Sequence, residues 1–170
     1  ASEAEHFHRW QAGQLRQGGV DFLVAQTLPN VNEAAGLARA MESTGLPYIV
    51  SFVISRDGCV LDGNDMQTAI ATVDAATGCK PLGYMVNCAY PSFLCADKQP
   101  AAVFERLVGY QANASSLDHH ELDGADELQR ESTAGWGELM LKLNRDYGVK
   151  ILGGCCGTGV EHLRYICQRR

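Results

Sequence analysis

Three of the seven cysteines in this 170-residue sequence stand at or shortly after the ends of runs that are typical of buried strands. Cys88 follows the run 82–87, and the adjacent Cys155 and Cys156 come shortly after the run 149–152. The carboxyl ends of parallel strands are where binding and catalytic groups gather in α/β proteins. Three thiolates that leave a fourth position open are the ligand set of a catalytic zinc ion, since structural zinc sites have four protein ligands.

Glycines surround the cysteine pair. Neighbouring residues of a regular strand point to opposite faces, so Cys155 and Cys156 can face one ion only if the chain bends. Gly153, Gly154 and Gly157 supply the backbone freedom for such a bend and let the chain pass close to a ligand. A cysteine that serves only as a small buried apolar residue gives no reason for these glycines.

The other cysteines and histidines carry weaker signals. His119 and His120 lie beside Glu121 and Asp123 and could bind a metal, but their polar surroundings favour a solvated loop. His162 falls inside the last expected helix and is interpreted as a surface or packing residue. Four cysteines are interpreted as inert thiols that act as small buried apolar residues: Cys59, Cys79, Cys95 and Cys167.

A different chemistry, nucleophilic or redox catalysis by Cys155 or Cys156, remains an alternative. A redox pair of this kind is usually a Cys-x-x-Cys motif, and a nucleophilic cysteine usually has a histidine partner. The sequence around Cys155 shows neither feature. The metal hypothesis therefore explains the pattern better.

Five strand-like runs alternate with helix-like segments. Strands that are apolar throughout are covered on both faces, which predicts a parallel sheet in an α/β fold. Two architectures fit: a small doubly wound sheet, or five βα units of an eight-stranded barrel. The expected strands are 20–27, 47–54, 81–88, 108–112 and 149–152. The expected helices are 2–16, a second capped by Asn32, 65–77 beginning at Asp65, 101–107, a segment around 136–143 that stops at Gly148, and 160–168.

Charge and hydropathy exclude several classes of partner. The formal net charge is −6, and the 14 lysines and arginines are scattered, so neither nucleic acid nor a membrane is an expected partner. No apolar run approaches the roughly 20 residues that a membrane span needs.

The total of seven cysteines is odd, which argues against a secreted disulfide framework. Several of them fall inside or at the end of strand-like runs, which favours a reducing compartment and hence a cytoplasmic location. Residues 1–170 are expected to form a single domain. Because the sequence opens with Ala1 and has no leader, we expect it to begin partway through a larger architecture. Removal of a tag or of an initiating Met would give the same opening.

Several segments together resemble the homocysteine S-methyltransferase family, which includes the homocysteine-binding module of cobalamin-dependent methionine synthase and the betaine-dependent enzymes. The match spans essentially the whole chain, and its pattern of one cysteine followed by a distant pair is specific. The segments that carry the resemblance are 151–158 with Glu161, His162, Leu163 and Ile166; Val86–Cys88; 21–23 with 27–30 and 33–34; Asp62–Gly63; and Gln111–Ala114.

The resemblance implies a (β/α)8 TIM barrel of which this chain supplies about five units, the fourth to eighth strands. It also implies Zn²⁺-dependent methyl transfer to the thiol of homocysteine, giving methionine, with S-methylmethionine or S-adenosylmethionine as the expected donor. The zinc ligands would be Cys88, Cys155 and Cys156, and the substrate-binding residues Gln26, Thr27 and Asn87.

The sequence departs from the family pattern in two ways. Gln26 stands where the family has a glutamate that helps to hold the amino acid substrate, and the early strands of the barrel have no counterpart. We therefore expect little turnover from these 170 residues alone. Open sheet edges also predict a homo-oligomer or a complementary chain. The alternative function is a non-catalytic zinc-binding or interaction domain derived from the family.

Overall fold

The computed structural model describes residues 1–118, 121 and 129–169. Its strands are β1 (Leu23–Leu28), β2 (Tyr48–Phe52), β3 (Gly83–Ala89), β4 (Leu107–Ala112) and β5 (Ile151–Gly154). Its helices are α1 (Ser2–Gln17), α2 (Val31–Glu42), α3 (Met66–Ala76), α4 (Ala101–Arg106), α6 (Thr133–Tyr147) and α7 (Val160–Arg169), with short 3₁₀ turns η1 (Pro91–Leu94) and η2 (Ala96–Lys98). Within the described ranges, every helix is too short or too polar to cross a membrane.

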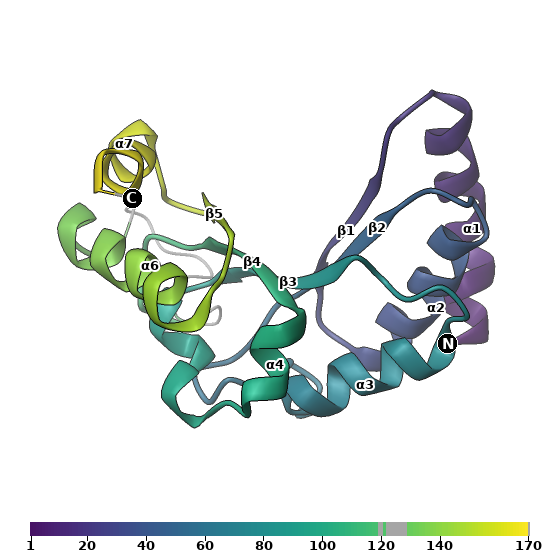
Figure 1. Cartoon of the computed structure of the whole chain (residues 1–170), viewed down its shortest axis with the longest axis horizontal. Coiled ribbons are helices and arrows are strands. Elements are labelled where there is room, and N and C mark those ends of the chain that lie inside the picture. Colours follow the sequence, from purple (N-terminus) through teal and green to yellow (C-terminus); the bar gives the residue numbers. More distant parts are fainter. Residues whose placement is uncertain (119–120, 122–128, 170) are drawn as a thin grey trace.

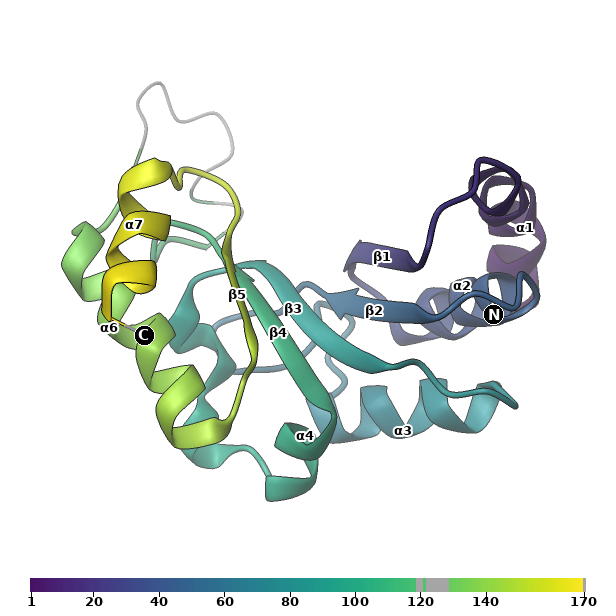
Figure 2. The same cartoon turned by 45° about the horizontal axis from the view of Figure 1, so that its top comes forward.

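The five strands form one parallel sheet in the sequential order β1-β2-β3-β4-β5. A doubly wound sheet reverses its strand order at a switch point, so that alternative is wrong. Figures 1 and 2 show the sheet as a curved arc, with β1 and β5 at its two ends and the helices along its outer side. The chain is thus an α/β arc of a (β/α) barrel, as the resemblance implied.

The first and last strands lie further along the chain than their apolar runs suggest. Pairing of β1 starts at Leu23, whose N–H donates to the Pro47 carbonyl at 2.9 Å, so Val20 and its neighbours precede the sheet. β5 runs two residues beyond the expected end, because Gly153 and Gly154 pair with β4. The consequence is that β5 ends immediately before Cys155.

The helix ends follow from specific capping residues. Asn30, rather than the expected Asn32, caps α2: its backbone is extended and its side chain accepts hydrogen bonds from the N–H groups of Asn32 and Glu33 at 2.9 and 3.2 Å. The third expected helix was placed to begin at Asp65, and Asp65 is in fact its capping residue, since its side chain accepts from the N–H of Thr68. Gly148 ends α6 in the left-handed conformation, with φ 74°, as the sequence predicted.

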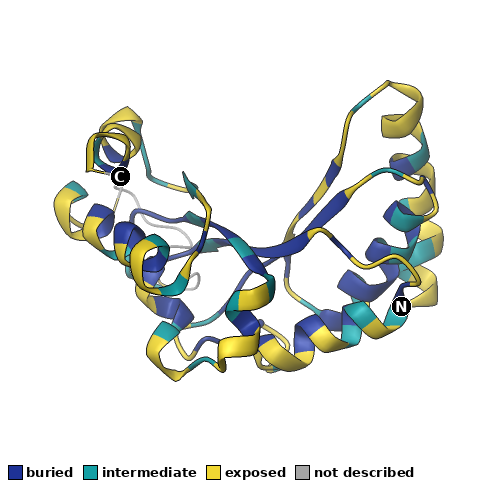
Figure 3. Cartoon of the chain, viewed as in Figure 1, coloured by how far each residue is buried: buried dark blue, intermediate teal, exposed yellow. Residues whose placement is uncertain are grey.

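The core lies between the strands and the outer helices, and the central strands are its most buried part (Figure 3). All five residues of β2 are buried, and the ring of Phe52 stacks on that of Tyr84 with centroids 6.0 Å apart. Full burial of an aromatic side chain of this size contributes roughly 1.5–3 kcal/mol. Packing of β2 and β3 therefore fixes the centre of the arc.

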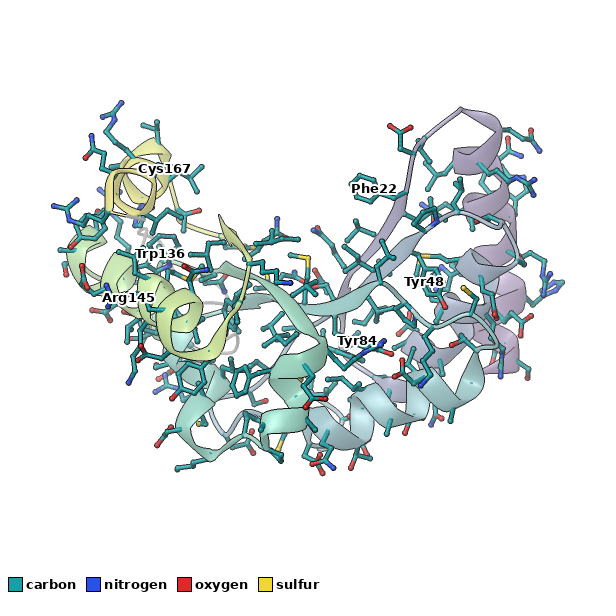
Figure 4. All side chains as sticks on the ribbon, viewed as in Figure 1. Phe22, Tyr48, Tyr84, Trp136, Arg145 and Cys167 are labelled. Atoms are coloured by element: carbon teal, nitrogen blue, oxygen red, sulfur yellow. The ribbon has the colours of Figure 1, made fainter. Side chains whose placement is uncertain are left out.

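The two ends of the sheet expose apolar side chains. Within the described ranges, β1 and β5 each pair on one side only, and Phe22, Val24 and Ile151 are 54%, 39% and 45% exposed. Figure 4 shows Phe22 projecting from the start of β1 toward the open side of the arc. Exposed apolar residues next to unpaired backbone groups are typical of surfaces that another segment covers.

Candidate metal centre

Cys88 lies near the end of β3 in an unusual backbone conformation. Its φ is 58°, in the left-handed region that residues other than glycine rarely adopt. The register between β3 and β4 shifts between Asn87 and Ala89, so Cys88 interrupts the ladder at this point. Such a conformation costs on the order of 1–3 kcal/mol and persists where surrounding structure enforces it. The distortion brings the Cys88 thiol to the thiols that follow β5.

Cys155 and Cys156 follow β5 in a tight turn. A Cβ atom at Gly154 would stand 2.2 Å from Oγ1 of Thr158, so only glycine fits where the turn folds back. Gly157 has φ 75°, a conformation that glycine adopts without strain. The Thr158 hydroxyl donates to the Cys155 carbonyl at 2.7 Å and closes the turn. The expected bend at the glycines is present, and each cysteine lies outside the regular strand.

The three sulfur atoms form a compact triangle. The Sγ atom of Cys88 lies 3.3 Å from that of Cys155 and 3.6 Å from that of Cys156, and the last two are 3.9 Å apart. A tetrahedral ion with Zn–S bonds of about 2.3 Å separates two sulfur ligands by roughly 3.8 Å. These residues therefore fit a zinc ion with one further position. Among the described residues, this is the one group of three metal-ligand side chains that meets within 4.8 Å.

Asn113 joins the two strand ends that carry the thiols. Its side-chain amide donates to the Cys88 carbonyl at 3.0 Å and accepts from the N–H of Cys156 at 3.2 Å. The carbonyl of Asn113 accepts a hydrogen bond from the Trp136 indole at 3.0 Å, which fixes the loop after β4 against α6. The sequence placed Asn113 in a family-like segment but gave no reason to assign it a role at the sulfurs.

The buried His162 packs behind this loop. Its ring meets the Trp136 ring edge to face, with centroids 5.0 Å apart, and its Nδ1 accepts from the N–H of Gly159 at 3.1 Å. Figure 4 shows Trp136 in the part of the molecule formed by α6, α7 and β5. Of the two expected roles, a surface or a packing residue, the complete burial of His162 confirms packing and excludes the surface. Its contacts hold the start of α7 near the cysteine turn.

The local environment disfavours an isolated Cys88 thiolate. Burial, together with hydrogen bonds to Cys155 and Cys156, raises the pKa of the Cys88 thiol well above its ordinary value. Three thiolates at these distances would also repel one another. A bound cation reverses both effects because it stabilises the deprotonated sulfurs.

A second polar group connects the ends of β1, β2 and β3. The Asn87 side chain accepts from the backbone N–H of Thr27 at 2.9 Å and from the Ser51 hydroxyl at 2.6 Å, and donates to the Thr27 hydroxyl at 2.7 Å. Thr27 has φ 62°, a strained value for a β-branched residue. Asn87 therefore fixes the position at which β1 bends, immediately beside Gln26.

Gln26 reaches across the concave side of the sheet. Its Nε2 donates to Oε1 of Gln111 at 2.7 Å, which links the first strand to the fourth. A Cβ atom at Gly153 would lie 3.2 Å from Cγ of Gln111, so Gln111 packs over the strand that leads into Cys155. The residues expected at the substrate site thus lie along the same carboxyl edge as the sulfurs. Gln111 is an additional member that spacing alone could not single out.

The other histidines, acidic residues and cysteines that the sequence offered as candidates do not contribute to the sulfur triangle within the described residues. His119, His120 and Asp123 lie outside the described residues. The side chains of Cys79 and Cys167 are exposed, so their interpretation as buried apolar residues was wrong, while Cys59 and Cys95 are partly buried as space-filling thiols. None of these four belongs to the sulfur triangle.

The sequential parallel arc and the three sulfurs at its carboxyl edge define a (β/α)-barrel protein with a candidate thiolate metal centre. The family model for homocysteine S-methyltransferase matches residues 1–170. The chain belongs to the homocysteine S-methyltransferase family.

Curated relatives match most or nearly all of this chain. The chain is 26% identical to homocysteine S-methyltransferase 4 from Zea mays, over 98% of this chain and 49% of that protein. It is 24% identical to betaine–homocysteine S-methyltransferase 1 from Xenopus laevis, over 98% of this chain and 44% of that protein. It is also 27% identical to methionine synthase from Mycobacterium leprae, over 89% of this chain and 13% of that protein. The chain thus spans half or less of each of these relatives.

A solved structure supports the barrel arrangement. The homocysteine methyltransferase from Escherichia coli, in its apo form, superposes with a TM-score of 0.67 and 19% identity, over 99% of this chain and 56% of that chain. At this identity the likeness concerns the fold. It agrees with an arc that covers part of a barrel.

Proposed function

We propose that this protein binds one Zn²⁺ ion through Cys88, Cys155 and Cys156 and uses this centre to methylate the thiol of homocysteine, giving methionine. The observation that carries the proposal is the sulfur triangle, with Sγ separations of 3.3–3.9 Å at the carboxyl ends of two parallel strands. Membership of the homocysteine S-methyltransferase family supports the choice of reaction.

Zinc binding requires that the chain hold its three cysteine ligands close together. When bound, zinc supplies a Lewis acid that keeps a coordinated thiol deprotonated near neutral pH. Cys88 comes from β3 and the cysteine pair from the turn after β5, so the ligand set needs both strand ends in register. The Asn113 amide keeps them there by bonding to the backbone of Cys88 and of Cys156.

The amino acid end of the acceptor is proposed to bind beside Gln26, Thr27 and Asn87. Thr27 and Asn87 are bonded to each other, so their main contribution is to hold the bend of β1 in place. Gln26 and its partner Gln111 then present amide groups on the concave side. This arrangement positions a substrate whose thiol reaches the sulfur triangle.

The proposed donor is a sulfonium compound, S-methylmethionine or S-adenosylmethionine. The thiolate sulfur of homocysteine forms a bond to the methyl carbon as the bond from that carbon to the donor sulfur breaks. The electron pair leaves with the donor sulfur, which becomes a neutral sulfide. Because the sulfonium carries its own activation, no general acid is required, and the protein contributes position and a deprotonated acceptor.

Isothermal titration of homocysteine into the zinc-loaded protein tests the proposal. A free thiol has a pKa of about 8.5, so binding as a thiolate near pH 7 should release close to one proton, measured in two buffers of different ionisation enthalpy. The Cys155→Ser variant should lose this binding, and Cys79→Ser, which removes an exposed thiol outside the triangle, should keep it. Absence of homocysteine binding to the zinc-loaded protein would count against methyl transfer.

A non-catalytic zinc-binding domain is the second candidate, favoured by the open edges of β1 and β5 and by the neutral Gln26. It predicts one zinc per chain without homocysteine binding. Because the methyltransferase needs a closed pocket, we also expect the 170 residues alone to form methionine from homocysteine and S-methylmethionine far below an ordinary enzymatic rate of about 1–1000 per second. Reduced thiols are needed throughout, so we propose a cytoplasmic location.

A further inference from the structure

The described sheet carries no charged side chain. The residues of β1 to β5 include amides, hydroxyls and thiols, but no Asp, Glu, Lys, Arg or His. Recognition of a substrate by the strands therefore relies on neutral hydrogen-bonding groups. Gln26 and Gln111 are the ones that meet across the concave side, with Nε2 and Oε1 2.7 Å apart.

Most charged groups of the described loops and helix ends around this edge are already bound to other groups, whereas Asp97 in the turn after β3 lines a hollow against α6. The pairs are Arg56 with Asp118 and Glu121, Arg130 with Glu161, Glu131 with Ser116, Asp62 with the Val31 N–H, Asp57 with the Cys59 N–H, and His8 with Glu33. These contacts satisfy the charges locally. Among the residues that the structure describes, the amide pair is therefore the main polar feature on the concave side of the sheet.

The amide pair has both a donor and an acceptor to offer. With one N–H of Gln26 bonded to Gln111, the Gln26 carbonyl remains an acceptor and the Gln111 NH₂ group remains a donor. A secondary amide presents the complementary N–H and C=O together. An ammonium group, in contrast, gains most from a carboxylate, since a charge-assisted hydrogen bond is roughly twice as strong as a neutral one.

We propose that the subsite formed by Gln26 and Gln111 accepts N-acylated amino thiols about as well as amino thiols with a free ammonium group. This inference rests on the proposed function, because the ligand thiol is taken to occupy the open position beside Cys88, Cys155 and Cys156. It deepens that function by naming the head group that the site tolerates: a neutral amide in place of a charged amine.

Competitive isothermal titration of homocysteine and N-acetylhomocysteine on the zinc-loaded protein tests the inference. The wild-type protein should bind the two thiols within about threefold of each other. The Gln26→Glu variant restores a carboxylate at the exposed end of β1 and should favour homocysteine by roughly tenfold or more. Gln67→Glu makes the same charge change at an exposed position of α3 and should leave the ratio unchanged.

The possible results distinguish a failure of this inference from a failure of the proposed function. A wild-type preference for homocysteine of tenfold or more would overturn the neutral-head inference while leaving the proposed function in place. Failure of both thiols to bind the zinc-loaded protein would remove the proposed function and the inference together. The wild-type comparison decides the matter even if Gln26→Glu does not fold.

Discussion

The Sγ atoms of Cys88 and Cys155 lie 3.3 Å apart although 67 positions separate the residues in the sequence. Parallel pairing of β3 with β4 and of β4 with β5 brings the two strand ends to the same edge of the sheet. The left-handed φ of Cys88 and the glycine turn after β5 then direct the thiols toward each other. The proximity thus depends on the pairing of β3, β4 and β5 and not on a local motif alone.

Removal of one sulfur should abolish tight metal binding. We expect Cys155→Ser to weaken zinc affinity on the order of a hundredfold or more, because two thiolates cannot complete the ligand set. Competition with a chromophoric chelator measures the affinity. Cys79→Ser, at an exposed thiol outside the triangle, should bind zinc as the wild type does. Equal affinities for the wild type and Cys155→Ser would refute the assignment of Cys155 as a ligand.

Loss of the Asn113 amide should loosen the metal centre without removing a sulfur. Asn113→Ala deletes the bonds to the Cys88 carbonyl and the Cys156 N–H, and groups that orient metal ligands are typically worth 10–100-fold in affinity. We expect a loss in that range by chelator competition.

Asn144→Ala is the matched control for Asn113→Ala. It removes an amide that bonds to the Val149 carbonyl at 2.8 Å, so it should cost about 1 kcal/mol of stability while leaving zinc affinity intact. If both variants lost metal affinity equally, the effect would reflect general destabilisation rather than the geometry of the sulfurs.

Asp62 should make stability depend on pH. Its carboxylate accepts from the Val31 N–H at 2.6 Å and so fastens the start of α2 to the loop after β2. Burial acts to raise the pKa of Asp62, but this bond and those from Asn64 lower it below its ordinary value. Because the folded pKa is lower than the unfolded one, the stabilisation is present above the unfolded pKa and is lost as pH falls through the folded pKa.

Urea unfolding of the wild type and of Asp62→Asn at several pH values tests this dependence. The variant should be less stable than the wild type at pH 7, by about 1 kcal/mol for one charge-assisted bond, and the difference should shrink as the medium is taken below pH 4. Asp57→Asn, which alters a carboxylate bonded to the neighbouring Cys59 N–H, is the control. A difference that stayed constant from pH 7 to pH 3 would contradict the linkage.

The open edges should cause self-association of the 170-residue protein. Val24 on β1 and Ile151 on β5 expose apolar side chains beside unpaired backbone groups. Light scattering after size exclusion should detect oligomers, and Val24→Lys with Ile151→Lys should shift them toward the monomer. Lys142→Arg, a change on the helix α6, should have no such effect. A monodisperse wild-type monomer would refute this prediction.

Much of the fold could be predicted from the sequence because its signals are local. Apolar runs marked all five strands, the helix expected to begin near Asp65 begins there, and Gly148 ends α6 where it was expected to. The misplaced cap at Asn32 shows the limit: Asn30 and Asn32 have the same chemistry, and the extended backbone at Asn30 decides between them. The choice between barrel and doubly wound sheet required strand order, which periodicity does not encode.

The sequence could predict those parts of the candidate site that follow from residue types alone. The cysteines at strand ends and the flanking glycines pointed to the triangle, whereas the role of Asn113 and the pairing of Gln26 with Gln111 depend on register between distant strands. The left-handed conformations of Cys88 and Thr27 could not be predicted either, because neither residue type favours a positive φ. Tertiary contacts impose these features, so no short sequence pattern reports them.

Zinc-edge X-ray absorption on protein purified without chelator, combined with metal analysis, tests the central claim most directly. The account predicts one zinc per chain with three sulfur ligands at about 2.3 Å in the absence of homocysteine, and a fourth sulfur when homocysteine is added. Fewer than three sulfur ligands, or far less than one zinc per chain, would contradict it.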